Sequence, residues 1–340
     1  MAGLSRTIAL KEVQLCPLCG NKGRDFLFFG REHEYEGTTA QEFAFHRCTK
    51  CGLVYMAPRP DEFALPVIYP ANYYSRVSVN ASPDDVTLNS FAGRMLYKRL
   101  LGRMAGNMRP FLTLTAEHRV LDVGCGGGRS LKSLNMAFGC ETVGIDTDVT
   151  DDLVARYNGA PITIVRGDFM SYDFGAQQFD VVYASHLIEH LPNPVDFMRR
   201  AYACTKPGGL CILETPNVDC FAFRLLGRHW GGNHIPRHWF MLSPATARRI
   251  AEVSVPGGWK LLDVRFSPNA AFWIWSFHSW LVSLGLKTVA DLLFPSDHRI
   301  VSVGPVNIAR HGMFTVLDSL VKIVTGRSGN MSVIYRRSDG

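Results

Sequence analysis

From residue 119 onward, short apolar runs alternate with longer segments in which apolar residues recur at helical spacing. Five runs have the length of buried strands: VLDV (120–123), TVGI (142–145), ITIV (162–165), DVVYA (180–184) and LCIL (210–213). Two further strand candidates, KLLDVRF (260–266) and MSVIY (331–335), flank a helix-rich region. This alternation predicts an α/β fold, a doubly wound, seven-stranded and mostly parallel sheet with helices on both faces.

The chain before residue 119 has a different pattern. Residues 11–60 are rich in cysteine, glycine and aromatic residues, which indicates short strands and turns, and a proline-punctuated segment follows. Ser90 to Met104 has apolar residues at helical spacing and predicts an amphipathic helix. We therefore predict a small module over 1–60, a linker with this helix over 61–118, a core over 119–266, and a helical insertion with the last core strand over 267–340.

Residues 270–286 form the most apolar segment of the insertion, with three tryptophans and four polar interruptions. Its 17 residues fall short of the ~20 apolar residues that a membrane-spanning helix needs. We expect a buried helix that caps the substrate site. The alternative is a helix that lies on a membrane surface and gives the protein a peripheral membrane contact.

Composition indicates the class of protein and its expected cellular location. Apolar residues make up 47% of the 340 residues and charged residues 19%, which is typical of a globular protein. The first ten residues lack the apolar stretch of a secretory signal, and five of the nine cysteines show no disulfide-framework spacing. A reducing, cytoplasmic location is therefore expected, with the membrane surface as the alternative.

The other four cysteines form two C-x-x-C units, Cys16–Cys19 and Cys48–Cys51, and each unit is followed by a glycine. Four thiolates at this spacing suit tetrahedral zinc in a closed structural site. A redox-active pair is the alternative, but that motif normally occurs singly in a strand–helix unit. The sequence predicts a zinc ribbon in which these four cysteines bind the metal.

The first core strand runs into a glycine loop, with Gly124, Gly126 and Gly128 following Asp122. A dinucleotide fingerprint requires a glycine or alanine where this chain has Arg129, which disfavours a nicotinamide oxidoreductase. A Gly-Lys-Ser/Thr sequence that would bind nucleotide phosphates is also absent here. The pattern D-x-G-x-G-x-G instead resembles motif I of the class I S-adenosylmethionine-dependent methyltransferases.

This resemblance continues in order over residues 119–217, through VGIDTD, GDF, FDVVYASHLIEHLPNP and KPGGLCILETPN. It implies a Rossmann-like methyltransferase fold that uses S-adenosylmethionine. A carboxylate near the glycine turn suits the cationic methionine end of that cofactor, and a second can accept two ribose hydroxyls. The expected cofactor contacts are Asp122, Gly124, Gly126 and Gly128, then Asp146 at the ribose, Asp168 and Phe169 at the adenine, and Ser185. The alternative is that Asp122 orients the loop and Asp146 caps the next helix.

His186 to His190 match the H-x-x-E-H pattern of a class of zinc peptidases, but they follow a strand directly and two prolines interrupt the next turn. The same residues resemble the loop after the fourth strand of the methyltransferases, which borders the methyl group. His186 and His190 are therefore candidate proton acceptors. His238 lies in HWFMLSP, a stretch similar to one in the same family, and is the third catalytic candidate. Each histidine has a packing or capping role as its alternative.

Residues 221–251 contain five arginines, three histidines and no acid. Because the topology places this segment over the methyl donor, we expect an anionic acceptor held by Arg224, Arg228 and Arg237. The segment FHRCTKCGLVYMAPRPDE resembles the zinc-ribbon module that precedes the core in bacterial methyltransferases, some of which act on nucleotide sugars. The expected activity is thus methyl transfer to an anionic small molecule or a glycan precursor.

Two other functions stay open. Some ribosomal RNA methyltransferases also begin with a zinc module, but the net charge of +6 is modest for a nucleic-acid partner. The second open function is that of a non-catalytic protein, which binds the cofactor or binds a partner protein through its zinc ribbon. The sequence leaves the acceptor atom and the oligomeric state undetermined.

Overall fold

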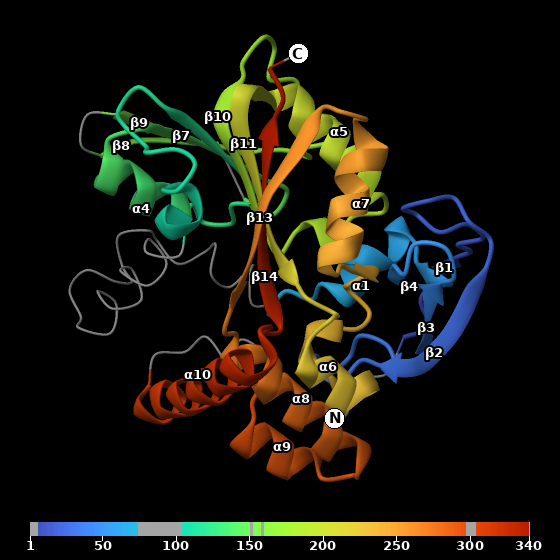
Figure 1. The fold of residues 1–340 in the computed structure, drawn as a ribbon. Coiled ribbons are helices and arrows are strands. Elements are labelled where there is room, and N and C mark those ends of the chain that lie inside the picture. The colour runs from blue at the N-terminus through green and yellow to red at the C-terminus, as the bar shows by residue number, and fades with distance from the viewer. Residues whose placement is uncertain (1–5, 74–103, 150–151, 158–159, 297–303, 340) are drawn as a thin grey trace.

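The computed structural model describes residues 6–73, 104–149, 152–157, 160–296 and 304–339. Its centre is a sheet with the strand order β13-β14-β11-β10-β6-β7-β9-β8 (Figure 1). The seven predicted strands are confirmed: β6 (Arg119–Val123), β7 (Glu141–Asp146), β9 (Ala160–Arg166), β10 (Phe179–Ser185), β11 (Thr205–Pro216), β13 (Trp259–Ser267) and β14 (Asn330–Arg337).

Five strands, β6, β7, β9, β10 and β11, pair in parallel, and β14 runs antiparallel between β11 and β13. Alternate residues of the strands face opposite sides, as the two-residue period of a strand requires. Leu121 and Val182 belong to the core on one face, whereas Val120 and Val181 belong to the core on the other. Because the parallel strands all end at one edge of the sheet, the residues that follow them converge there.

One strand of the central sheet was not anticipated. β8 (Leu153–Tyr157) pairs antiparallel with β9 at the edge of the sheet, where the alternating pattern predicts only a helical connection. In a stretch of five residues with few turn signals, periodicity alone cannot separate a strand from a helix. The doubly wound prediction therefore holds, with one additional edge strand.

Helices cover both faces of the sheet (Figure 1). α5 (Pro194–Cys204) and α7 (Pro244–Ser254) contribute to the core on one face, while α4 (Arg129–Phe138) and residues 104–108 pack on the other. The amphipathic helix predicted for residues 90–104 lies outside the described residues except for Met104, which is helical and buried.

The cysteine-rich segment forms β1 (Leu10–Lys11), β2 (Arg24–Arg31), β3 (Glu42–Cys48), β4 (Val54–Met56) and β5 (Arg59–Pro60). Its larger sheet has the order β12-β4-β3-β2, in which β12 (Phe240–Met241) comes from the far end of the catalytic core. Phe240 pairs with Tyr55, and Met241 with Val54. The N-terminal module thus shares a sheet with the loop that follows β11.

A short connection, η1 (Glu62–Ala64) and α1 (Leu65–Ile68), leads from the module toward the core. The segment after β10 forms η2 (Ile188–His190), and the segment after β11 forms α6 (Phe221–Leu226), η3 (Gly227–His229) and η4 (Gly231–Asn233). The predicted helical insertion consists of α8 (Ala270–Ser283), α9 (Lys287–Leu293) and α10 (Pro305–Thr325), which lie at the lower end of the molecule in Figure 1. Among the described residues, none of these helices is both long and apolar enough to cross a membrane.

Candidate active site

A cavity of about 310 Å³ opens where the parallel strands end. One wall follows β6, β7 and β9, and the other combines α1 and its flanking residues with the turn after β10. The lining residues are Val123, Gly124, Ile145, Asp146, Thr147, Asp148, Gly167, Asp168, Phe169 and Met170 on the first wall, and Leu65, Tyr69, Tyr73, His186, Leu187, His190 and Leu191 on the second.

The glycine loop between β6 and α4 has the backbone that the sequence predicts. Gly124, Gly126 and Gly128 all have positive φ, at 73°, 52° and 71°. A Cβ atom at Gly128 would lie 2.3 Å from the Cδ1 atom of Ile164, so the close approach of this turn to β9 requires glycine. The loop thereby brings its backbone to the rim of the cavity.

Asp146 ends β7 and holds this loop in place. One carboxylate oxygen accepts a hydrogen bond of 2.8 Å from the amide of Gly126, and the other accepts one of 2.8 Å from the amide of Asp148. Burial raises the pKa of Asp146, whereas the two backbone donors lower it. A carboxylate oriented in this way at the cavity wall can accept further hydrogen bonds from a vicinal diol such as a ribose.

Asp122 is the second-to-last residue of β6, directly before the cavity-lining Val123, and is 4% exposed. Burial, reinforced by the nearby carboxylates of Asp146 and Glu214, raises the pKa of Asp122 to about 8. A positive charge close by would favour the ionised form of this carboxyl group. A cationic ligand bound nearby would therefore stabilise the ionised form of Asp122.

Asp168 and Phe169 follow β9 and both line the cavity. Asp168 stabilises its own turn, because it accepts hydrogen bonds from the amide of Met170 and the hydroxyl of Ser171. Ser185, the last expected cofactor contact, is not among the lining residues; its hydroxyl donates to the Oε2 atom of Glu214 at 3.1 Å.

His186 has the most unusual backbone of the three histidine candidates. It follows β10 with φ of 52°, a left-handed conformation that is costly for a residue with a Cβ atom. Its ring lines the cavity, and its Nδ1 atom lies 3.3 Å from the Oε1 atom of Glu189. Glu189 is fully buried, and its other oxygen accepts a hydrogen bond of 3.1 Å from Thr215. A buried carboxylate thus faces one nitrogen of an imidazole that borders the cavity.

His190 also lines the cavity, but its surroundings disfavour a charged ring. Its Nδ1 atom lies 2.8 Å from the hydroxyl of Tyr69, and burial lowers the pKa of His190 to about 3. His238 lies behind it, 3% exposed and outside the lining, with its Nδ1 atom donating to the carbonyl of Gly232 at 2.8 Å. Burial likewise lowers the pKa of His238 well below the ordinary range. Both rings are neutral near pH 7.

Glu189, His190 and His238 each bring one potential ligand atom within 4.8 Å of the others. A carboxylate and two imidazoles form a donor set that divalent transition metals accept. In the present arrangement the contacts within the protein already orient the two rings, through Tyr69 and the carbonyl of Gly232.

The N-terminal module reaches the second wall of the cavity through Glu32 and Glu34. The carboxylate of Glu34 accepts from His234 at 2.8 Å, and the other nitrogen of that ring lies 3.0 Å from the hydroxyl of Tyr73. Glu32 forms an ion pair with Arg237, whose Nε atom donates to the carbonyl of Ile68 at 2.7 Å. This network ties the segment after β11 to residues about two hundred positions earlier.

These contacts contradict the expectation that Arg237 binds the substrate. Its side chain is fully buried, and its charge is balanced by the carboxylates of Glu32 and Glu34. The stretch 221–251 contains no acid, so the sequence suggested that Arg237 is unpaired. The acids that balance it, Glu32 and Glu34, lie about two hundred residues earlier.

Arg224 and Arg228 are also placed differently from the expectation. Both are exposed and outside the lining of the cavity; Arg224 pairs with Asp219 at 2.7 Å, and Arg228 donates to His229. Arg224 borders a different cavity of about 620 Å³ that also includes Arg47 and Asp219. The structure therefore does not bring the three predicted arginines together over the glycine loop.

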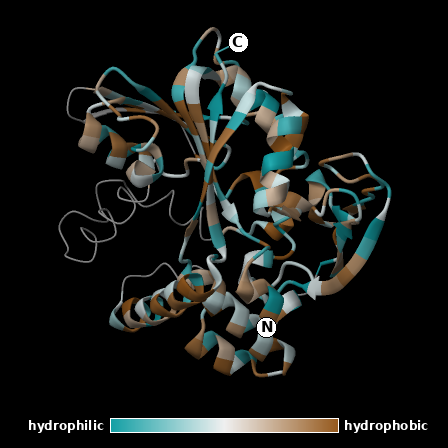
Figure 2. Cartoon of the chain, viewed as in Figure 1, coloured by the Kyte–Doolittle hydropathy of each residue, from teal (hydrophilic) through white to brown (hydrophobic). Residues whose placement is uncertain are grey.

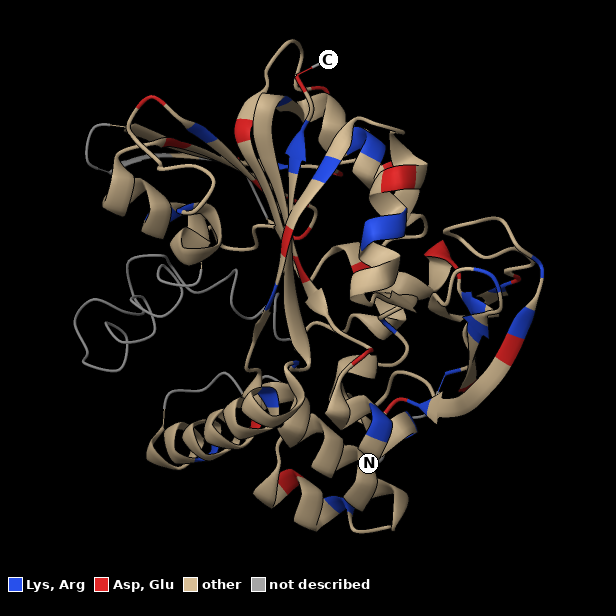
Figure 3. Ribbon diagram, in the orientation of Figure 1, with Lys and Arg blue, Asp and Glu red and all other residues tan. Residues whose placement is uncertain are grey.

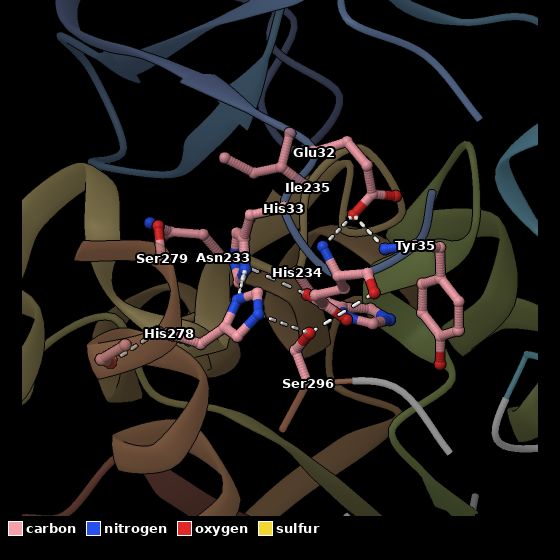
Figure 4. Close-up of polar contacts among 12 residues, drawn as sticks. Glu32, His33, Tyr35, Asn233, His234, Ile235, His278, Ser279 and Ser296 are labelled. Carbon is pink, nitrogen blue, oxygen red and sulfur yellow. Dashed lines mark hydrogen bonds and ion pairs between the residues drawn. The ribbon is translucent and has the colours of Figure 1, made fainter. Parts of the chain in front are cut away.

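α8 closes the second wall from behind. The ring of Trp275 stacks on His234 with centroids 5.5 Å apart, and Phe272 meets His186 edge-on at 6.0 Å. His278, also on α8, contacts the module through His33 at 3.0 Å (Figure 4). Eight of its fourteen residues are buried, which agrees with a buried helix beside the site.

Sequence reasoning did not single out Glu32, Glu34, Tyr69 or Glu189. The signal available for the first two was the acidic pair that flanks His33, in a module that otherwise suggested only metal binding. Glu189 lay within the rejected peptidase pattern, and its role as the partner of His186 depends on the left-handed turn after β10.

The four predicted zinc ligands converge in the module. Their sulfur atoms all lie within 4.8 Å of one another, with Cys16–Cys51 and Cys19–Cys48 at 3.6 Å. Zn–S bonds of about 2.3 Å in a tetrahedron place sulfur atoms roughly 3.8 Å apart, so the spacing fits zinc and is too long for disulfide bonds. The two turns are matched, since the amides of Gly20 and Gly52 donate to the carbonyls of Cys16 and Cys48.

Comparison with known proteins places this arrangement in a family. Residues 96–254 match a family profile described as a methyltransferase domain. A ubiquinone biosynthesis O-methyltransferase from Ruegeria pomeroyi is 31% identical over 197 residues, which cover 55% of this chain and 77% of the relative. The enzyme of the same name from Bordetella pertussis is 33% identical over 127 residues, 35% of this chain and 52% of the relative.

Two solved structures are also similar. The [4+2]-cyclase SpnF has a TM-score of 0.45 and 16% identity, with 78% of this chain and 94% of that chain covered. Coclaurine N-methyltransferase has a TM-score of 0.42 and 12% identity, with 79% of each chain covered. The profile match, the relative from Ruegeria pomeroyi and the order of the strands agree with one another. The chain belongs to the class I S-adenosylmethionine-dependent methyltransferases.

Proposed function

We propose that this methyltransferase transfers a methyl group to a hydroxyl oxygen of a small, mostly apolar aromatic acceptor, with His186 as the proton acceptor. The observation that carries the proposal is the second wall of the cavity, which combines leucine, tyrosine and histidine side chains. Among the described residues that line the cavity, none is lysine or arginine. A neutral ring can pack there, whereas an anion would find no opposite charge.

S-adenosylmethionine, when bound, supplies an activated methyl group on a sulfonium ion. Asp146 would accept the ribose hydroxyls, the loop from Gly124 to Gly128 would pass close to the methionine end, and Phe169 would border the adenine. Because the donor is already activated, the residues of this chain contribute mainly by position and by the exclusion of water.

Removal of the hydroxyl proton is the step that needs a base. His186 fits this role better than His190 or His238, because it borders the cavity and its Nδ1 atom faces the buried carboxylate of Glu189. With the proton on Nδ1, Nε2 would be the acceptor, and the carboxylate 3.3 Å from Nδ1 would stabilise the imidazolium that forms, as in carboxylate–histidine pairs elsewhere. The strained backbone of His186 is consistent with a position selected for function.

The relatives named ubiquinone biosynthesis O-methyltransferases support an oxygen acceptor. The anionic or glycan acceptor expected from the sequence has less support, since Arg237 is neutralised and the other two arginines lie outside the cavity.

The deciding experiment compares acceptors that differ only in charge. We would measure methyl transfer from labelled S-adenosylmethionine to 4-alkylcatechols, to the matched catechol phosphates, and to a set of nucleotide sugars. The proposal expects the neutral catechols to have the highest kcat/KM, with a methyl ether as product. Preferred turnover of the phosphates or the nucleotide sugars would contradict it and restore the anionic acceptor.

We also propose that the module holds one structural zinc ion through Cys16, Cys19, Cys48 and Cys51. The spacing of the four sulfur atoms and the matched turns support this assignment. The metal would fix the ends of β3 and β4, and β4 pairs with β12 beside the second wall of the cavity.

A further inference from the structure

α10 has an outer face composed almost entirely of apolar side chains. Every exposed residue from Pro305 to Val324 is apolar or glycine, and the polar Thr325 ends the helix. The large exposed side chains are Val306, Ile308, Met313, Val316, Leu317, Leu320, Ile323 and Val324, with exposed fractions from 36% to 84%. Figure 2 shows these brown segments along α10, at the end of the molecule away from the carboxyl terminus.

This face is not needed to hold the helix on the protein. The opposite side of α10 makes those contacts: Phe314 packs on Phe277 and Phe294, with ring centroids 5.7 and 6.1 Å apart. Asp318 accepts hydrogen bonds of 2.9 Å from the indole of Trp273 and from the amide of Asn269. A surface helix normally turns charged residues to water, so a wholly apolar outer face indicates contact with something other than water.

We propose that the outer face of α10 docks this protein on the surface of an anionic lipid bilayer. A bilayer needs no directional partner, and the exposed face offers no hydrogen-bonding side chain before Thr325. Interfacial helices of this kind bury their apolar face at the boundary between headgroups and acyl chains.

The charges around the face favour an anionic surface. α10 contains Arg310 and Lys322, which are half-buried beside the apolar face, and the ammonium group of Lys322 donates to the carbonyl of Phe266. Its only acid, Asp318, is 1% exposed and hydrogen-bonded within the protein. Figure 3 shows α10 mostly in tan, with few charged positions along the helix. Cations beside an apolar strip add electrostatic attraction to anionic headgroups.

A second copy of this chain is a less suitable occupant. A helix of 21 residues is roughly 31 Å long at about 1.5 Å per residue, so a strip about 10 Å wide offers on the order of 300 Å². A stable protein interface needs about 800 Å² on each partner, with hydrogen bonds distributed through it. α9 also exposes Val289, Leu292 and Leu293, and both helices pack on α8. A lipid surface can adapt to both helices, whereas a protein partner would have to match their shapes.

The proposal is independent of the acceptor proposed above, because it concerns a surface outside the cavity. The test is flotation of the full chain with extruded vesicles of 3:1 phosphatidylcholine and phosphatidylglycerol, and with vesicles of pure phosphatidylcholine. We expect the wild-type protein to float with the anionic vesicles, and the double variant Val316→Glu/Leu320→Glu to bind them at least tenfold more weakly.

Phe63→Glu is the matched control, since Phe63 is 87% exposed on η1 and outside the cavity. It should bind vesicles like the wild type. Circular dichroism and cofactor affinity should be unchanged in all variants, and the milder pair Ile323→Ser/Val324→Ser serves if the double glutamate variant misfolds. Absence of wild-type binding to the anionic vesicles would overturn the proposal. So would light scattering that shows a wild-type dimer converted to a monomer by the α10 variants, which would identify the face as a dimer interface.

Discussion

The two walls of the cavity are built in different ways. The first wall, where the cofactor would bind (the cofactor wall), comes from consecutive strand ends between residues 123 and 170. Its polar groups hydrogen-bond within this segment. The second wall, where the acceptor would bind (the acceptor wall), is lined by α1 and its flanking residues and by the turn after β10. The segment 234–238, α8 and acidic residues of the N-terminal module support it from behind. Segments separated by about two hundred residues must meet before the second wall exists.

This difference has a chemical consequence. In the cofactor wall, Asp146 and Asp168 lie at strand ends and line the cavity, as their positions in the sequence predict. In the acceptor wall, the charge of Arg237 is balanced by Glu32 and Glu34, and Glu34 also contacts His234. Perturbations of the module should therefore affect the acceptor wall and spare the cofactor wall.

The largest effect should follow removal of the metal. In Cys48→Ser/Cys51→Ser, we expect one zinc per chain to be lost, and with it a binding free energy of ~10–16 kcal/mol, the range for small zinc modules. The disturbance should reach the active site, because the amide of Met56 donates to Trp239, and the amide of Trp239 donates to Glu189. Elemental analysis would measure the loss of zinc, acceptor kinetics the loss of turnover, and calorimetry the affinity for the cofactor, which should be retained.

A Cys220→Ser variant provides the control, since Cys220 is buried in the core outside the module. Retention of zinc in the double variant would remove the metal assignment. Loss of cofactor affinity equal to the loss of acceptor turnover would show that the two walls are not separable.

Replacement of the proposed base should have the next largest effect. For His186→Asn we expect kcat to fall by roughly 10²–10⁴-fold with cofactor affinity unchanged, because the loss of a general base affects the chemical step. His229→Asn, on η3 and outside the cavity, is the matched histidine control and should keep its kcat. Steady-state rates at saturating cofactor would test this. A comparable fall in His190→Asn but not in His186→Asn would transfer the role to His190.

Arg237→Met tests whether this arginine is structural. Because the change leaves Glu32 and Glu34 without their cation, we expect the free energy of unfolding to fall by about 3–5 kcal/mol. Arg224→Met, which breaks an exposed pair with Asp219, should cost no more than ~1 kcal/mol. Urea denaturation would measure both. A stable Arg237→Met protein with a raised acceptor KM would instead support the substrate-binding role.

Asp146→Ala should act on the cofactor wall alone. Loss of a carboxylate that accepts the ribose hydroxyls should weaken S-adenosylmethionine binding by ~1.5–3 kcal/mol. The unfolding temperature would reveal any separate effect of freeing the amides of Gly126 and Asp148. Calorimetry on Asp146→Asn, which keeps an acceptor oxygen, should give a smaller loss. Unchanged affinity in the alanine variant would exclude Asp146 as the ribose ligand.

The last prediction concerns the pH dependence of stability without cofactor, where the change within one pH unit is modest and accumulates over several units. Because burial raises the pKa of Asp122 to about 8, this carboxyl group is protonated in the folded chain and ionised in the unfolded chain at intermediate pH. Its contribution to stability is complete below the ordinary pKa of an aspartate, and it declines by ~1.4 kcal/mol per pH unit until the pH passes 8. The difference in unfolding free energy between wild type and Asp122→Asn, measured from pH 5 to pH 9, should follow this slope. A difference that does not vary with pH would contradict the buried, protonated carboxyl group.

Much of the fold could be predicted because its determinants are local. Each core strand is a contiguous apolar run, and the connections between them have helical periodicity. β8 and β12 were missed because short strands acquire their identity from a neighbour: β8 from β9, and β12 from β4 of the distant module. Whether such a short segment forms a strand depends on the strand with which it pairs, and the periodicity of its own sequence does not identify that partner.

For the candidate site, the sequence by itself determined the cofactor wall and the four cysteines, because fixed spacings within one strand–loop unit already bring those groups together. Only the tertiary structure decided the acceptor wall. It paired Arg237 with Glu32 across 205 residues, turned His186 toward Glu189 through a left-handed residue, and left the apolar face of α10 outside. The physical reason is that the charge and exposure of a side chain depend on the groups that meet it in space, and long-range contacts between segments set these properties.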